Sequence, residues 1–266
     1  MCYIHKEMKY LVVGGHGFIG SHLCKEMRER GFDFDIYDKN IPNGSPLNSI
    51  VKQRRKGLDD SISYDSLDGR FYDTVIHLGS YAGIRSSLPT QDYFSNNVYD
   101  LQVLLSKLNF YKVVYISSSS VLGNVETPYS LSKKIAESII KKEKDSLIIR
   151  PFTVYGEYGR PEMFITKVVN REKIIVNGNP SEIIRNFTYV GDLVNVIIEN
   201  LGEVGALNVI GEKEYSLLDV LNIFNLDFSV TDADPRDFTS HKYNELDINK
   251  YTKTNIEDFS KKMRGL

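Results

Sequence analysis

Two residues four positions apart, Tyr129 and Lys133, are the clearest candidates for chemistry in this sequence. Residues at i and i+4 share one face of a helix, and a helix is expected over Tyr129–Glu143. An ammonium beside a phenol lowers the pKa of the phenol from about 10, so Tyr129 could take a proton from an alcohol. Ser118 follows a predicted strand and could hydrogen-bond the same alcohol. The alternative for this common pattern is an exposed helix start without chemistry.

A glycine-rich turn near the start of the chain is the second candidate site. Its glycines follow a short apolar run and precede a helical pattern. Gly14 permits a tight turn, Gly17 lets the backbone approach a pyrophosphate, and Gly20 lets the helix pack closely on the strand. Asp38 ends the next predicted strand, where a carboxylate accepts the ribose hydroxyls and repels a 2′-phosphate, although Lys39 beside it weakens this preference. These features favour an NAD site over a tight turn without a ligand.

Alternating strands and helices must position these residues. The pattern predicts an α/β fold, a Rossmann-type doubly wound parallel sheet whose sites lie at the carboxyl ends of the strands. Residues 1–8 are expected to be a tail, 9–151 an NAD-binding domain, and 152–266 a smaller substrate lobe interleaved with it. Residues 40–70 show little periodicity. The expected strands are Tyr10–Val13, Asp33–Tyr37, Thr74–Leu78, Lys112–Ser117, Ser146–Arg150, Ile174–Val176 and Leu207–Ile210, and the other expected helices are Ile19–Arg30, Tyr93–Leu108, Met163–Asn170, Val190–Asn200 and Ser216–Phe224.

From about Lys9 to about Tyr251, the order of the motifs resembles the extended short-chain dehydrogenases/reductases, in the NAD-dependent nucleotide-sugar epimerase/dehydratase family. The resemblance implies catalysis by Ser118, Tyr129 and Lys133 on a nucleotide sugar, with bound NAD. The motifs are the glycine turn, His77–Arg85, Asn97, Ser117–Gly123, Tyr129-x-x-x-Lys133, Arg150–Gly156, Arg185–Asp192 and Leu207-Asn-Val.

The same resemblance implies the residues that contact each ligand. Arginines suit the diphosphate of a nucleotide sugar because a guanidinium pairs bidentately with phosphate. Arg85 is included because Ala82–Arg85 and Gly159–Met163 are similar to bacterial UDP-glucuronate 4-epimerases. The implied NAD site comprises Gly14, Gly17, Phe18, Ile19, Gly20, Asp38, Leu78, Gly79, Ser80, Asn97, Tyr129, Lys133 and Pro151, and the implied substrate site comprises Ser118, Tyr129, Thr153, Arg185, Arg236 and Arg85.

The residues after Ser118 bear on the reaction. Dehydratases of this family carry an Asp-Glu pair there to expel water, whereas this chain has Ser119 and Ser120, which are neither strong acids nor strong bases. We therefore expect a 4-epimerase, which oxidises and re-reduces one sugar carbon, with a UDP-sugar as substrate. Two alternatives remain open: an NAD(P)H-dependent reductase of 4-keto nucleotide sugars, and a non-catalytic NAD-binding sensor. The loop from Gly123 to Tyr129 is shorter than in relatives, which leaves the sugar identity open.

The overall composition sets the remaining expectations. A net charge of −2 indicates neither nucleic-acid nor acidic-membrane binding, and no apolar run is long enough to span a membrane. With only two cysteines, Cys2 and Cys24, and no His/Cys cluster, we expect no metal and a cytoplasmic protein. His77 is expected to be a hydrogen-bonded structural residue rather than a base. The family resemblance implies a homodimer through helices that contain residues 98–105 and 135–140.

Overall fold

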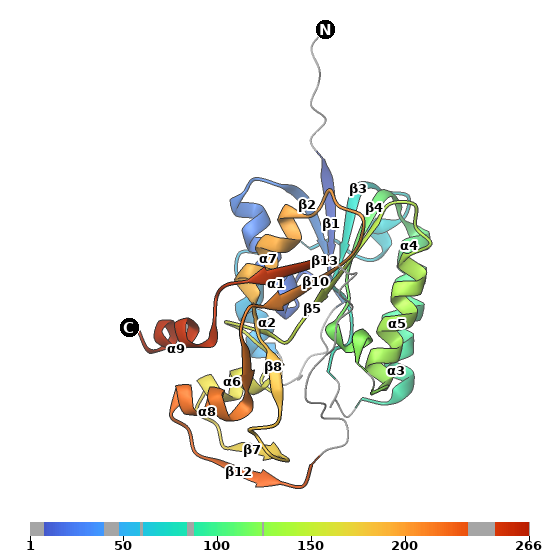
Figure 1. Ribbon diagram of the computed structural model, residues 1–266. Helices are drawn as coiled ribbons and strands as arrows, with labels where there is room; N and C mark the ends of the chain where they lie inside the picture. The colour runs from blue at the N-terminus through green and yellow to red at the C-terminus, as the bar shows by residue number, and fades with distance from the viewer. Residues whose placement is uncertain are drawn as a thin grey trace.

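The computed structural model describes residues 8–39, 48–58, 61–83, 88–123, 125–233 and 248–265. Within these residues a single sheet of seven strands, all parallel to their neighbours, forms the centre of the fold (Figure 1). The predicted Rossmann-type parallel sheet is therefore confirmed. Across the sheet the strands are β13 (Ile248–Thr252), β10 (Gly205–Gly211), β5 (Ser146–Pro151), β4 (Asn109–Ile116), β3 (Phe71–His77), β1 (Lys9–Val13) and β2 (Asp33–Tyr37).

Helices cover both faces of this sheet. On one face α1 (Phe18–Glu29) packs beside α7 (Val190–Glu199), and their apolar side chains join those of the strands in one core. Helices α4 (Asp100–Lys107) and α5 (Pro128–Ile140) lie on the other face, as Figure 1 shows. Their apolar side chains contribute to a second core. Burial on both faces explains why the central strands are continuous apolar runs.

The helix predicted over Tyr93–Leu108 is divided into three parts. Helix α3 (Thr90–Phe94) is followed by a wide π-helical turn at Ser95–Tyr99 before α4 begins. Turns of this kind concentrate at functional sites because they redirect one or two side chains. Here the wide turn carries the buried Asn97.

The segment expected to be irregular contains a helix. Helix α2 (Asn48–Arg55) and a short 3-10 turn at Asp65–Leu67 lie between β2 and β3. The sequence did not indicate α2 because its mean hydropathy is low and five of its eight residues are Lys, Arg, Gln or Asn.

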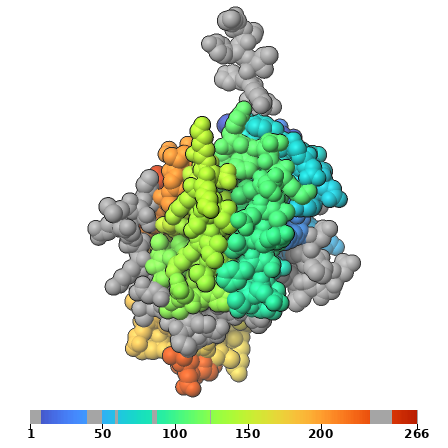
Figure 2. All heavy atoms as spheres, turned by 90° about the vertical axis from the view of Figure 1, so that its right-hand side faces the viewer, coloured from blue at the N-terminus to red at the C-terminus, as the bar shows by residue number. Residues whose placement is uncertain are grey.

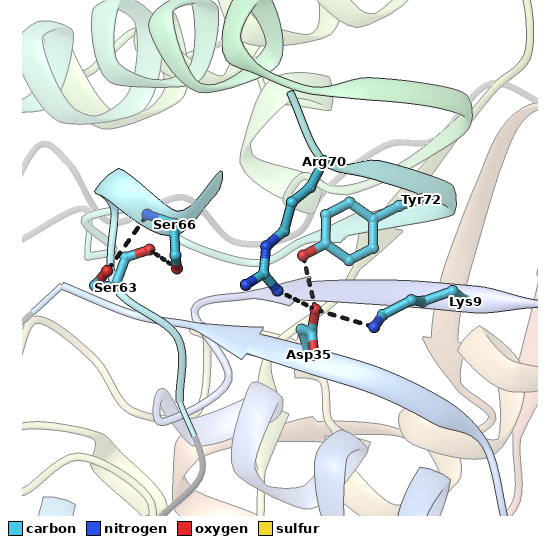
Figure 3. A network of polar contacts seen from close by, with 6 residues as sticks. All are labelled: Lys9, Asp35, Ser63, Ser66, Arg70 and Tyr72. Atoms are coloured by element: carbon cyan, nitrogen blue, oxygen red, sulfur yellow. Dashed lines mark hydrogen bonds and ion pairs between the residues drawn. The ribbon is translucent and has the colours of Figure 1, made fainter. Parts of the chain in front are cut away.

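The carboxylate of Asp35 links three neighbouring strands on the side of the sheet away from the glycine turn. Asp35 of β2 accepts a 2.8 Å hydrogen bond from the hydroxyl of Tyr72 of β3, and it pairs with Arg70 and Lys9 (Figure 3). Burial, reinforced by Asp35, raises the pKa of Tyr72 to about 12. These contacts join β1, β2 and β3 at their amino-terminal ends and leave the carboxyl ends free for a site.

The residues after position 151 divide between the central sheet and a smaller lobe. Strands β10 and β13 belong to the central sheet, and β13 was not predicted from the polar sequence around it. The lobe has its own apolar core. Its elements are β6 (Val154–Tyr155), α6 (Phe164–Val169), β7 (Ile174–Asn177), β8 (Ile184–Asn186), β9 (Thr188–Tyr189), β11 (Glu214–Ser216), α8 (Leu217–Phe224), β12 (Phe228–Thr231) and α9 (Ile256–Arg264).

Candidate active site

The glycine turn connects β1 to α1 with no space for larger residues. Gly14 has a φ of +82°, and a Cβ atom there would lie 2.7 Å from the backbone nitrogen of Gly79. A Cβ atom on Gly20 would lie 2.1 Å from the carbonyl oxygen of Gly14. Helix α1 begins at Phe18 without a side-chain cap and without an acidic residue in its first turn. Its first N–H groups and the positive end of its dipole are therefore available to a phosphate.

Asp38 lies against the glycine turn. Its carboxylate accepts a 2.7 Å hydrogen bond from the backbone N–H of His16, and its partial burial raises its pKa. The imidazole of His16, to which the sequence analysis gave no role, is buried: its Nε2 lies 3.1 Å from the carbonyl oxygen of Leu58. Arg55 of α2 donates from Nε to the Nδ1 of His16 at 3.2 Å. A cation therefore lies close to Asp38, and the sequence analysis missed it because α2 was not predicted.

Ser118 and Tyr129 come together at the carboxyl end of β4. Helix α5 begins with Pro128, and Thr127 and Ser130 form a reciprocal capping box that fixes the first turn. This start buries Tyr129, and the hydroxyl of Ser118 hydrogen-bonds its phenol. Burial raises the pKa of Tyr129 more than the Ser118 bond and the charge of Arg160 lower it. The expected lowering of this pKa by Lys133 is therefore not present in this structure.

Lys133 hydrogen-bonds groups at the carboxyl edge of the sheet rather than Tyr129. Its ammonium donates to Ser80 Oγ at 2.9 Å, to Tyr115 Oη at 3.1 Å and to the carbonyl oxygen of Ile116 at 2.8 Å. Burial lowers the pKa of Lys133 to about 7, and the negative charge of Glu137 opposes this effect. The lysine expected to tune Tyr129 is thus held by a second tyrosine, which sequence spacing did not indicate.

A buried ion pair lies one turn further along α5. Glu137 receives hydrogen bonds from Arg150 of β5 to both carboxylate oxygens, at 2.8 and 2.7 Å. The hydroxyl of Ser117 donates to the same carboxylate at 2.7 Å. The side chains of Glu137 and Arg150 are only 5% and 9% exposed. The pair therefore fixes α5 against β4 and β5 directly behind Lys133.

Asn97 connects the π-helical turn to the site. Its amide donates to the hydroxyl of Ser132 and to the carbonyl of Tyr81, and it accepts from the N–H of Tyr81 at 2.7 Å. Asn97 therefore fixes the loop after β3, which contains Gly79 and Ser80, against helix α5.

The other predicted site residues lie in three places. Leu78 donates from its N–H to Val13 beside the glycine turn, and Pro151 ends β5. Thr153 accepts a hydrogen bond from the N–H of Thr188. Arg185 lies on β8 in the lobe and donates to the carbonyl of Ile184. Arg85 and Arg236 lie outside the described residues.

Arg160 is a cation of the site that the sequence analysis did not select. It donates to the carbonyl of Ala82 at 3.0 Å and pairs with Glu162 at 3.2 Å. Its positive charge lowers the pKa of Tyr129. The signal was present in the Gly159–Met163 stretch, which the sequence analysis used only to support Arg85.

His77 is buried on β3 beside Tyr115. Burial lowers its pKa to about 3, so the ring is neutral at physiological pH. We expected a hydrogen-bonded histidine, but Nδ1 has no hydrogen-bond partner within the described part of the chain. In the same part of the chain, no group of three metal-ligating side chains occurs and no helix is long and apolar enough to cross a membrane.

Comparison with known proteins identifies the family. The family model described as "NAD dependent epimerase/dehydratase family" matches residues 10–209. The chain belongs to this family. It is therefore an NAD-dependent enzyme, as the sequence motifs predicted. The family includes both epimerases and dehydratases, so membership alone does not choose between these reactions.

Individual relatives agree with this assignment. The chain is 31% identical over 228 residues to protein CapI of Staphylococcus aureus, covering 71% of this chain and 68% of that protein. It is 29% identical over 258 residues to the uncharacterized UDP-glucose epimerase YtcB of Bacillus subtilis, covering 81% of each. The fold matches the crystal structure of a UDP-glucuronic acid 4-epimerase variant from Bacillus cereus with a TM-score of 0.74 at 23% identity, over 95% of this chain and 96% of that one.

The geometry of the glycine turn fits NAD. A Cβ atom on Gly20 would clash with Gly14, so the first turn of α1 packs directly against the glycine turn. A pyrophosphate site requires this close packing. Asp38 lies where it would accept hydrogen bonds from the adenosine ribose, and Ser80 and Lys133 lie at the carboxyl edge of the sheet where the nicotinamide half would bind.

Proposed function

We propose that this protein is a nucleotide-sugar 4-epimerase whose substrate is a UDP-sugar. One observation carries the choice of reaction: Ser118 and Tyr129 are in contact, while the two positions after Ser118 hold the buried serines 119 and 120. A dehydratase needs an acid and a base at these positions to expel water from the sugar. Serine hydroxyls do neither at neutral pH, which favours a reaction confined to the alcohol carbon.

Each of these residues has a separate role at the C4 hydroxyl group of the sugar. Tyr129 accepts the proton of the sugar C4 hydroxyl as the carbon is oxidised, and it returns a proton to that oxygen in the reverse step. Ser118 hydrogen-bonds the oxygen and holds it beside the phenol. Lys133 supplies positive charge and binds the nicotinamide ribose. When bound, NAD supplies the redox chemistry by accepting a hydride from C4 and giving it back to the opposite face of the sugar.

The raised pKa of Tyr129 limits its role as a base. Burial keeps the phenol protonated in the structure, whereas a general base must be deprotonated. The positive charges of Lys133, Arg160 and the nicotinamide ring all favour the phenolate. We therefore propose that Tyr129 becomes an effective base only when these positive charges together outweigh the effect of burial.

Arg160 favours a sugar that carries a carboxylate. Its positive charge acts on the same phenol that would contact the sugar, and Glu162, with which it pairs in the described part of the chain, has a side chain that is 61% exposed. A sugar carboxylate could replace this exposed partner. Among UDP-sugars we therefore propose UDP-glucuronate ahead of UDP-glucose. Arg185 and Arg236 are proposed to hold the diphosphate and Thr153 to contact the substrate.

The test is turnover of a panel of nucleotide sugars. Wild type is incubated with UDP-glucuronate, UDP-glucose, UDP-N-acetylglucosamine and the corresponding dTDP- and GDP-glucose, and C4 epimers are resolved by chromatography. We expect epimers of a UDP-sugar, at least about a hundredfold slower with Tyr129→Phe, and an unchanged rate with the exposed control Tyr99→Phe. A Tyr129→Phe variant that keeps most activity would exclude the mechanism. Consumption of NAD(P)H with a 4-keto sugar would instead identify a reductase, and binding without any conversion would identify a sensor.

We also propose that the protein is a homodimer in the cytoplasm. Figure 2 shows the outer face of α4 and α5, on which α5 exposes the apolar residues Leu131 and Ile135, and the π-helical turn before α4 exposes Tyr99. An open hollow of about 780 Å³ lies at the other end of the same two helices. Light scattering should give twice the mass of one chain, and Ile135→Glu should give a monomer; a monomeric wild type would contradict the dimer. The buried thiol of Cys24 forms no disulfide within the described residues, which suits a reducing compartment.

A further inference from the structure

The ammonium of Lys133 has three hydrogen-bond acceptors in the structure, one for each N–H group. One acceptor is the backbone carbonyl of Ile116, and the other two are the hydroxyl groups of Ser80 and Tyr115. The ring of Tyr115 also lies under the ammonium, with its centroid 4.6 Å from Nζ. Tyr115 therefore stabilises the charged form of Lys133 twice, through its oxygen and through its aromatic face.

The position of Tyr115 is fixed by the sheet. It lies on β4, opposite His77 of β3 in the parallel register, and is completely buried. Burial raises the pKa of Tyr115 far above the physiological range, so its hydroxyl stays neutral. Ser80 hydrogen-bonds this hydroxyl as well as Lys133. A neutral phenol held in this way is a permanent acceptor for the ammonium.

We propose that Tyr115 is a positioning residue that keeps the ammonium of Lys133 charged and directed into the cofactor site, and thereby sets the pH range over which the enzyme binds NAD. The inference rests on the proposed role of Lys133 at the nicotinamide ribose. Tyr115 itself does not contact the sugar. Tyr115 acts only through Lys133.

The charges around Lys133 explain why the hydroxyl group of Tyr115 affects the protonation of Lys133. Glu137, from the same helix, stabilises the ammonium, but Arg150 of β5 neutralises much of this effect by pairing with Glu137. The phenol of Tyr129 and the imidazole of His77 are uncharged at neutral pH. Because burial lowers the pKa of Lys133 to about 7 in spite of Glu137, the loss of a neutral acceptor should shift the protonation of Lys133 near neutral pH.

The test is the affinity for NAD as a function of pH, measured by calorimetry on cofactor-free protein between pH 5.5 and 9. In the proposed complex, protonated Lys133 exchanges its bond to Ser80 for a ribose hydroxyl and keeps its bond to Tyr115, so affinity falls as pH rises through the pKa of Lys133. Tyr115→Phe keeps the ring and removes one hydrogen bond to a charged group, which should move this fall down by about one pH unit. At pH 8 the variant should bind NAD about tenfold more weakly than wild type, and near pH 5.5 the two should agree.

The matched control is Tyr111→Phe, the same chemical change on the same strand at an exposed position. Its profile should superimpose on that of wild type. If Tyr115→Phe also superimposes on wild type, the proposal is wrong. Because the measurement uses no sugar, it gives the same answer whether or not the protein is an epimerase.

A second measurement separates positioning from a general structural effect. In a Lys133→Met background, Tyr115→Phe should change NAD affinity by less than twofold at pH 8, because the group through which it acts is missing. A tenfold loss that persists in this background would show that Tyr115 supports the fold instead, and would overturn the proposal. Melting curves of each variant establish that the proteins compared are folded.

Discussion

The ion pair between Glu137 and Arg150 provides a sharp test of how helix α5 is held. Replacing Glu137 with Gln keeps the shape of the side chain and its hydrogen bond from Ser117, but removes the charge that faces Arg150. Arg150 then loses the carboxylate that accepts two of its hydrogen bonds. Its side chain is only 9% exposed, so water cannot replace the lost carboxylate.

The size of the effect follows from this burial. Breaking a buried ion pair by removing one partner costs about 3–5 kcal/mol of unfolding free energy. For a chain of this size each kcal/mol lowers the melting temperature by about 2–4 °C, so Glu137→Gln should melt at least about 6 °C below wild type. Loss of the negative charge should also lower the pKa of Lys133 further.

Urea unfolding of cofactor-free protein measures the free-energy change. The matched control is Glu126→Gln, which breaks the pair of Lys134 and Glu126 near the start of the same helix. Those side chains are 35% and 63% exposed, so the control should cost less than about 1 kcal/mol. If Glu137→Gln unfolds within about 1 kcal/mol of the control, the pair contributes no more than a surface contact and the reasoning is refuted.

Three further predictions concern the cofactor site. Gly20→Ala places a Cβ atom 2.1 Å from Gly14 and should weaken NAD binding at least about a hundredfold by calorimetry, whereas Gly202→Ala, with nothing within 4 Å, should not. The pKa of Lys133 is about 7 in the folded protein and about 10.5 in the unfolded chain, so between these values the unfolded chain binds more protons. Stability against urea should therefore rise from pH 7 to 10, and Lys133→Met should lose this rise. Asp38→Asn should improve NADP affinity relative to NAD at least about tenfold, because Arg55 remains beside the ribose without an opposing carboxylate; an unchanged ratio would contradict this reading.

Much of the fold could be predicted because its signals are local. The spacing of Gly14, Gly17 and Gly20 between an apolar run and a helical pattern defines the β1–α1 turn without any distant contact. Tyr129 and Lys133 lie on one helix, as their spacing requires. Strands that are buried on both faces are continuous apolar runs, so the order of strands and helices was evident.

The remainder depends on contacts between distant segments. The direction of Lys133 is set by Ser80 and Tyr115, which come from a loop and a strand that no helical spacing relates to it. Helix α2 is polar and is recognised only through Arg54 and Arg55, which bond to residues over a hundred positions away and to the glycine turn. The polar strand β13 is formed by pairing with β10.

The most direct test of epimerisation follows the atom that leaves C4. A UDP-sugar carrying deuterium at C4 is converted by the enzyme in ordinary water, and the product is analysed by mass spectrometry and NMR. If Tyr129 and Ser118 serve oxidation and re-reduction at one carbon, the epimer will retain the deuterium at C4. Deuterium found at C6 of a dehydrated product, or lost to solvent, would contradict the account.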